Sequence, residues 1–310
     1  MKTPSDADRR FYSLNDYCQD TFGQKVYRLS LSGGMSCPNR DGTLGIGGCA
    51  FCSEGGSGDF AANAALPVEK QLAEARKRIE GKTGCRKFIA YFQSYTNTYA
   101  PVDRLRALFS AAMKPEEIVA LSIGTRSDCL PGNVLDLLCE LQSQKPVWIE
   151  LGLQTIHNKT LRLMNTHTTV EQFDQAVYAL HQRNIPVIAH VILGLPGETR
   201  EMMLDTVRHL SKLPISGVKL QLLHILRGTA LGESFAASPF PLMELSEYCE
   251  LVIDCLELLP PDIVIHRLTG DGPRSLLVAP LWSLDKKRVL NTIRHRLKER
   301  GTRQGALYHG

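Results

Sequence analysis

The sequence has no long apolar run, and this excludes a membrane-spanning enzyme. No stretch approaches the roughly 18 consecutive apolar residues that a transmembrane helix requires. The first ten residues have no apolar core of the kind found in secretory signal peptides. We therefore expect a cytoplasmic protein with no membrane partner, and we expect its nine cysteines to be reduced rather than paired in disulfides.

An excess of charge of one sign is also lacking. The 310 residues include 36 Lys and Arg and 32 Asp and Glu, which gives a formal net charge of +4. This bias is too small to indicate nucleic-acid binding by itself. With 43% hydrophobic residues, the composition is that of a globular enzyme built from one large or two smaller domains.

Three of the cysteines lie in one glycine-rich segment between Ser36 and Ser53. Cys37 and Cys49 are separated by eleven residues, and Cys49 and Cys52 by two. The Gly, Asn, Asp and Pro content of this segment predicts a loop. Three thiolates are one fewer than the four that complete a structural zinc site or an ordinary electron-transfer cluster. The count therefore indicates a [4Fe–4S] cluster with one iron open to a further ligand.

A zinc ribbon is the less favoured alternative, because it requires a second close pair of cysteines. The remaining cysteines of the predicted domains show no such spacing: Cys85, Cys129, Cys139, Cys249 and Cys255.

Strands and helices alternate along most of the chain. Strands are expected at 25–32, 87–93, 118–123, 147–151, 187–193 and 218–224, and helices at 8–22, 67–81, 102–113, 133–142, 170–183 and 200–213. This order implies parallel strands joined by right-handed crossovers. We predict an α/β fold, a partial (β/α)6 barrel of the TIM type, with a doubly wound sheet as the alternative.

Three parts are expected in the chain. An N-terminal helical segment covers 1–24, the partial barrel covers 25–225, and a C-terminal α/β extension covers 226–310. The extension is expected to contain helices at 243–259 and 286–300 and a short strand at 263–266. Because the segment from Pro239 to Pro241 is too short for a free tether, the extension should pack on the barrel.

Polar residues gather at the carboxyl ends of the predicted strands, where parallel α/β folds place their chemistry. One polar residue at a strand end is often only a cap, but five sets at equivalent positions favour a ligand site. The catalytic candidates are Tyr95, Gln154 and His190. The candidates for substrate binding are Tyr95, Asn97, Tyr99, Glu150, Lys219, His224, Arg267 and Asp271. The last two could instead dock the extension onto the barrel.

Several motifs together resemble a known family. They are Phe22-Gly-Gln-Lys-Val-Tyr, Cys37-Pro-Asn-Arg-Asp-Gly-Thr, Gly48-Cys-Ala-Phe-Cys, Phe92 to Tyr99, Gly124-Thr-Arg, Glu150 to Thr155, Gly194-Leu-Pro-Gly-Glu, His266 to Asp271 and Ala279-Pro-Leu-Trp282. With these motifs, nearly the whole chain resembles the YhcC-type bacterial radical S-adenosylmethionine (SAM) proteins, relatives of the Elongator catalytic subunit.

The resemblance implies a [4Fe–4S] cluster on Cys37, Cys49 and Cys52, and SAM as the second cofactor. SAM would be cleaved reductively to methionine and a 5′-deoxyadenosyl radical that abstracts a substrate hydrogen. Implied partners are an electron donor such as flavodoxin or ferredoxin and, because Elongator-like proteins act on the wobble uridine, a tRNA. By analogy, the residues implied to bind the cofactors are Phe51, Gln93, Thr125, Arg126, Gln154, Ile192 and Gly194.

The implied reaction is modification of the carbon-5 side chain of that uridine. Two departures from the relatives are evident: Asn165-Thr-His-Thr168 stands where they carry Asn-Arg-Gly-His, and no acetyltransferase domain is expected. The predicted last helix is rich in Lys and Arg and could bind RNA or form a solvated face. A radical SAM enzyme acting on a small metabolite, or a noncatalytic metal- or nucleic-acid-binding protein, stays an alternative, and the oligomeric state is open.

Overall fold

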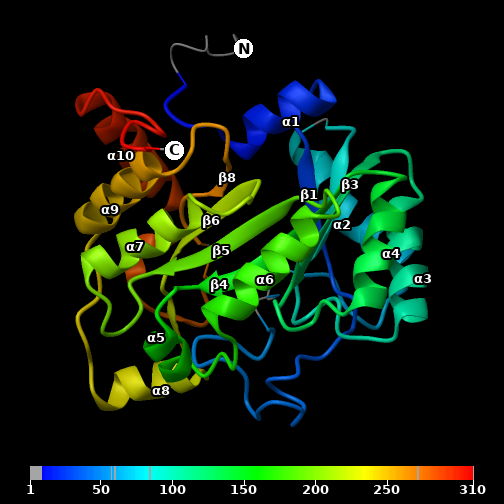
Figure 1. The fold of residues 1–310 in the computed structure, drawn as a ribbon, viewed down its shortest axis with the longest axis horizontal. Helices are drawn as coiled ribbons and strands as arrows, with labels where there is room; N and C mark the ends of the chain where they lie inside the picture. Colours follow the sequence, from blue (N-terminus) through cyan, green and yellow to red (C-terminus); the bar gives the residue numbers. More distant parts are fainter. Residues whose placement is uncertain (1–8, 57, 59–60, 84, 271, 310) are drawn as a thin grey trace.

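A seven-stranded parallel sheet forms the centre of the molecule (Figure 1). The computed structural model describes residues 9–56, 58, 61–83, 85–270 and 272–309. The strand order is β1-β2-β3-β4-β5-β6-β8, and every neighbouring pair is parallel. The strands are β1 Tyr27–Leu31, β2 Phe88–Phe92, β3 Ile118–Thr125, β4 Val147–Gln154, β5 Val187–Leu193, β6 Gly217–Leu222 and β8 Val264–Arg267.

This order confirms the predicted partial barrel. The strands curl into a half-barrel, and their order follows the chain without a reversal. A doubly wound sheet requires such a reversal, so that alternative is wrong. The sheet has one strand more than the six expected in the barrel, because the short strand predicted at 263–266 forms as β8 and pairs with β6.

Helices cover the outer face of the sheet. The helices of the barrel are α2 Val68–Thr83, α3 Val102–Met113, α4 Gly132–Gln142, α5 Asn158–Leu163, α6 Val170–His181 and α7 Arg200–Leu210. Except for α5, these helices pack their apolar faces against the outward-facing, alternate residues of the strands; the rings of Phe92 and Phe109, for example, lie edge to face at 5.2 Å. Of these helices, the six-residue α5 was not predicted, because one and a half turns show too little periodicity.

The intervening strand residues face inward, and the first level of them is apolar. Ile89, Ala120, Trp148 and Ile188 form this level together with Cys18 of α1, Leu14–Phe22. The rings of Tyr17 and Trp148 meet edge to face at 5.6 Å. Helix α1 therefore closes the amino end of the half-barrel, at the upper edge of Figure 1.

The rest of the chain packs against this half-barrel. It consists of β7 Ile225–Leu226, α8 Ala230–Ala237, α9 Leu245–Leu258, β9 Leu277–Ala279, the 3₁₀-helix η2 Leu281–Leu284 and α10 Lys286–Glu299. Helix α9 lies between α7 and α10. Arg296 of α10 pairs with Glu250 of α9 at 2.5 Å, and Arg300, the residue after α10, pairs with Asp254 of α9 at 2.8 Å. Within the described part of the chain, no helix is long and apolar enough to cross a bilayer.

Candidate active site

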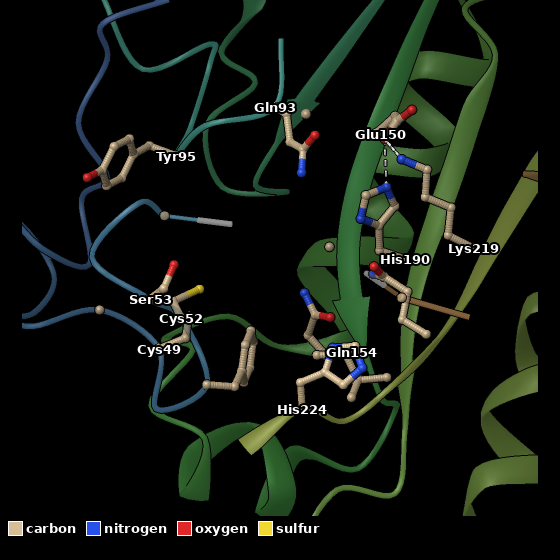
Figure 2. A pocket seen from close by; sticks show the side chains of 18 of the residues that line it. Cys49, Cys52, Ser53, Gln93, Tyr95, Glu150, Gln154, His190, Lys219 and His224 are labelled. Carbon is tan, nitrogen blue, oxygen red and sulfur yellow. Dashed lines mark hydrogen bonds and ion pairs between the residues drawn. The ribbon is translucent and has the colours of Figure 1, made fainter. Parts of the chain in front are cut away.

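A cavity of about 480 Å³ lies between the inner face of the sheet and the loop that carries the three cysteines. Figure 2 shows Cys49 and Cys52 on one side of it, and Glu150, His190 and Lys219 on the other. Most of the predicted site residues line it: Cys37, Cys49, Phe51, Cys52, Gln93, Tyr95, Thr125, Arg126, Glu150, Gln154, His190, Ile192, Lys219, His224 and Arg267. Its volume is in the usual range of small-molecule sites.

Tight turns shape the cysteine loop. The Cys37 carbonyl accepts hydrogen bonds from the amides of Arg40 and Asp41, at 2.8 and 3.2 Å, and the Cys52 amide donates to the Cys49 carbonyl at 3.0 Å. The Arg40 guanidinium donates to the carbonyl of Ser53 at 2.6 Å. One long side chain thus ties the first half of the loop to its end.

The segment at 164–168, which includes the predicted departure at Asn165 to Thr168, lies against the cysteine loop. The Ala50 amide donates to the Met164 carbonyl at 2.9 Å. The Arg126 guanidinium binds both carboxylate oxygens of Asp128, at 2.9 and 2.8 Å, and also donates to the Thr166 carbonyl at 2.9 Å. In this structure Arg126 therefore braces the 164–168 segment beside the thiols.

The chemistry of the donor set fits an iron–sulfur cluster. Three soft thiols face one cavity, with a guanidinium charge close to Cys37 and Cys49. A hydrogen bond to Cys52 and burial raise the pKa of the Cys49 thiol, while Arg126 acts in the opposite direction. In the described residues, no three His, Cys, Asp or Glu side chains are grouped as ligands of a single metal ion. A [4Fe–4S] cluster places each of its cysteine ligands on a different iron, so it needs a wider arrangement.

A buried ionic group forms the opposite wall. The Glu150 carboxylate is fully buried and accepts hydrogen bonds from Ser122 Oγ at 2.8 Å and from Lys219 Nζ, and it lies 2.9 Å from His190 Nε2. Lys219 also donates to the Tyr91 hydroxyl at 3.0 Å. Each side chain comes from the inward face of a different strand, which is why they meet.

Burial and neighbouring charges shift the pKa values of the residues in this wall. Burial alone would raise the pKa of Glu150, but the charges of Lys219 and Arg28 hold it well below its usual range. Burial and the nearby Lys219 lower the pKa of His190 to about 4. Burial also lowers the pKa of Lys219, against the effect of Glu150. At neutral pH the wall therefore presents an ionised carboxylate and a neutral imidazole.

Two wall residues were missed by the sequence analysis. Arg28 and Tyr91 both line the cavity, and the Arg28 guanidinium lies 5.2 Å from the centre of the Tyr91 ring. Arg28 Nη2 is also 2.8 Å from His266 Nδ1. The sequence signal for Arg28 was a charged residue that alternates with Leu29 and Leu31, in phase with Ser30, which also lines the cavity.

Two of the predicted catalytic residues have left-handed backbone conformations. Tyr95, at φ 58°, donates its hydroxyl hydrogen bond to the Glu54 carbonyl, and its ring covers Gly56. Gln154, at φ 69°, folds its amide over Gly152, where an added Cβ would lie 2.6 Å from Gln154 Nε2. Both residues face the cavity, but their catalytic roles stay predictions.

Three predicted residues are not among those that line this cavity, and their binding roles stay predictions. Asn97 is fully buried and donates to the Gly124 carbonyl at 2.9 Å. The Tyr99 hydroxyl pairs with the Thr43 hydroxyl at 2.9 Å, and both residues line a second cavity. The Gly194 amide faces the Met203 sulfur at 3.0 Å. These residues lie at or after strand ends in the sequence, but each contacts a neighbouring protein group. Asp271 lies outside the described residues.

The sequence matches the Radical SAM superfamily over residues 37–210 and the Radical_SAM C-terminal domain over residues 215–299. The chain therefore belongs to the radical SAM superfamily. It is 41% identical to the uncharacterized protein YtqA of Bacillus subtilis over 304 residues, 98% of this chain and 94% of that protein. It is 37% identical to protein YhcC of Escherichia coli K12 over 287 residues, 92% of each. The resemblance to YhcC-type proteins is thus confirmed.

More distant relatives link the chain to Elongator proteins. A tRNA uridine(34) acetyltransferase of Methanocaldococcus jannaschii is 26% identical over 163 residues, 52% of this chain and 30% of that protein. The structure of Methanocaldococcus infernus Elp3 with an N-terminal deletion aligns with a TM-score of 0.68 at 17% identity, over 90% of this chain and 64% of that chain. At this identity, the structural match shows a shared fold.

Proposed function

We propose that this chain is a radical SAM enzyme that modifies the carbon-5 side chain of a tRNA wobble uridine. The observation that carries the proposal is the cavity itself, which has three thiols on one side and a buried ionic wall on the other. The similarity to a tRNA uridine(34) acetyltransferase supports uridine in tRNA as the substrate.

Cys37, Cys49 and Cys52 would hold the [4Fe–4S] cluster, and the open part of the cavity would hold SAM. When bound, the reduced cluster supplies the electron that cleaves SAM and so starts hydrogen abstraction from the substrate. An electron donor such as flavodoxin or ferredoxin would serve as the reductant. Phe51, Gln93 and Gln154 line the space beside the thiols and would orient SAM.

The ionic wall would hold the side chain of the substrate base. The neutral His190 ring and the Lys219 ammonium reach the cavity from adjacent strands, while Glu150 fixes both in place.

The basic last helix is not a leading candidate for the RNA-binding surface. Arg296, and Arg300 just after the helix, pair with carboxylates of α9, although Lys287, Arg288, Arg294 and Lys298 are exposed. In Figure 1, α10 lies at the upper left, whereas the blue loop that follows β1 lies at the bottom. We therefore place the RNA contact at the mouth of the cavity.

Anaerobic reconstitution tests the enzyme class. The wild type should take up about four irons and release 5′-deoxyadenosine when given SAM and dithionite. Cys37→Ala, Cys49→Ala and Cys52→Ala should each lose the cluster, whereas Cys139→Ala on α4 should keep it. Tight zinc binding without SAM cleavage would support a noncatalytic metal protein instead.

Nucleoside mass spectrometry of tRNA tests the substrate. Cells that lack the gene should accumulate a differently modified wobble uridine, and a plasmid copy of the wild type, but not of Cys52→Ala, should restore it. An unchanged nucleoside profile, together with SAM cleavage by the purified protein, would favour a small-metabolite substrate.

A further inference from the structure

Asn39 is buried in a loop that is otherwise mostly exposed. It lies in the spacer between Cys37 and Cys49, where residues 41–44 are exposed, yet its own exposed fraction is 0%. A buried polar side chain costs free energy unless it forms hydrogen bonds. Its contacts therefore indicate what the loop requires at this position.

The amide of Asn39 reaches one of the cysteines. Its Nδ2 donates to Cys49 Sγ at 3.5 Å and to the Asn165 carbonyl at 2.6 Å. The Asn39 carbonyl accepts from the Gly48 amide at 2.8 Å. One residue thus contacts the cysteine, the residue before it and the segment packed against it.

Asn165 completes the arrangement from the opposite side. Its Nδ2 donates to the Gly48 carbonyl at 2.9 Å, so Gly48 is held through both of its backbone groups. Asn165 has φ 52°, a left-handed conformation that asparagine tolerates better than most residues. We call the pair Asn39 and Asn165 the asparagine clamp.

We propose that Asn39 is a positioning residue that sets the orientation of the Cys49 sulfur and the reduction potential of the cluster. The inference rests on the proposed function, since it assumes that Cys49 is a cluster ligand. A hydrogen bond to a ligating sulfur stabilises the more negative, reduced state and so raises the potential. Asn165 supports the same sulfur indirectly, by fixing Gly48.

The test measures the midpoint potential of the reconstituted cluster by EPR-monitored redox titration, together with iron content. Asn39→Ala should lower the potential by about 59 mV, which corresponds to a tenfold shift in the ratio of reduced to oxidised cluster. Asn165→Gly keeps the N–H···S bond and accommodates the positive φ, so it should cause a smaller shift. Asn63→Ala is the matched control, because Asn63 is exposed and its side-chain oxygen accepts a hydrogen bond from the Ala65 amide, two residues further along the chain.

A second measurement needs no cluster. Hydrogen exchange of the iron-free proteins should be faster at residues 48–50 in Asn39→Ala and Asn165→Gly than in the wild type, and unchanged in Asn63→Ala. If Asn39→Ala binds no iron, this measurement decides: faster exchange confined to 48–50 supports the clamp. Unchanged exchange there, or faster exchange throughout the sheet, refutes it.

The proposed function and the role of Asn39 would be refuted by different results. A wild type that takes up no iron overturns the proposed function, and the inference falls with it. A wild type with a full cluster, together with an Asn39→Ala variant of full iron content and unchanged potential, overturns the role of Asn39 alone.

Discussion

Replacing Lys219 by methionine tests whether the wall of the cavity is a true buried ion pair. The Lys219 side chain is 1% exposed, and its ammonium contacts the Glu150 carboxylate, which is 0% exposed. Methionine fills a similar volume without the charge. In Lys219→Met, the Glu150 carboxylate would stay buried but would lose the positive charge that offsets the cost of its burial.

The expected cost follows from the partners that Glu150 keeps. Removing one member of a buried pair usually lowers the free energy of unfolding by about 3–5 kcal/mol. Ser122 Oγ at 2.8 Å and the more distant Arg28 Nη2 at 3.8 Å would still stabilise the carboxylate. We therefore expect the lower end, about 3 kcal/mol.

The assay is urea unfolding of the iron-free, reduced protein at pH 7. Lys212→Met, at an exposed lysine just after α7, is the control and should change stability by less than about 0.5 kcal/mol. The double variant Glu150→Gln with Lys219→Met removes both charges and should be more stable than Lys219→Met by at least about 1 kcal/mol. A cost below about 1 kcal/mol for Lys219→Met, or strictly additive effects in the double variant, would refute the buried ion pair.

Three further predictions concern pH, SAM binding and the basic helix. Because the pKa of His190 is lowered from 6.5 to about 4, the unfolded chain binds the extra proton between these values. Stability should fall by up to about 3 kcal/mol as pH drops through this window, and His190→Gln should flatten the slope measured by urea unfolding. Gly152→Ala should displace the Gln154 amide and weaken SAM binding about tenfold in anaerobic calorimetry, roughly one lost hydrogen bond. Arg300→Met should lower the free energy of unfolding, measured with heat or urea, by about 1 kcal/mol, because the carboxylates of α9 lose the Arg300 guanidinium. The substitution Lys298→Met, at an exposed lysine, should cause no measurable change.

The fold could be predicted from the sequence because it follows from local patterns. Six apolar strands alternate with helices, and right-handed parallel crossovers leave few arrangements for such a chain. The strand at 263–266 was also predicted, but its pairing with β6 was not. That pairing joins residues 47 or 48 positions apart, and no local pattern specifies it.

The candidate site could be predicted where a residue type and a spacing carry its chemistry. The three cysteines are an example, and so are Glu150, His190 and Lys219 as polar residues inside apolar strands. The hydrogen-bond partners of residues that follow the strand ends are less predictable. Tyr99 follows a strand end just as Tyr95 does, yet it turns to Thr43 because the loop after β2 folds across the cysteine loop.

The proposed cluster site, at the cysteine loop, and the proposed substrate site, at the ionic wall, lie at different levels along the strands. Inward-facing residues on one strand lie two positions apart, so the apolar level at Trp148, the ionic level at Glu150 and the open level at Gly152 are successive positions of β4. The cysteine loop contacts the 164–168 segment rather than the ionic level. Substitutions at the ionic level can therefore alter what the cavity accepts without disturbing the thiols. Residues such as Lys219 are consequently where relatives with different substrates should differ, while Asn39 and the cysteines should stay the same.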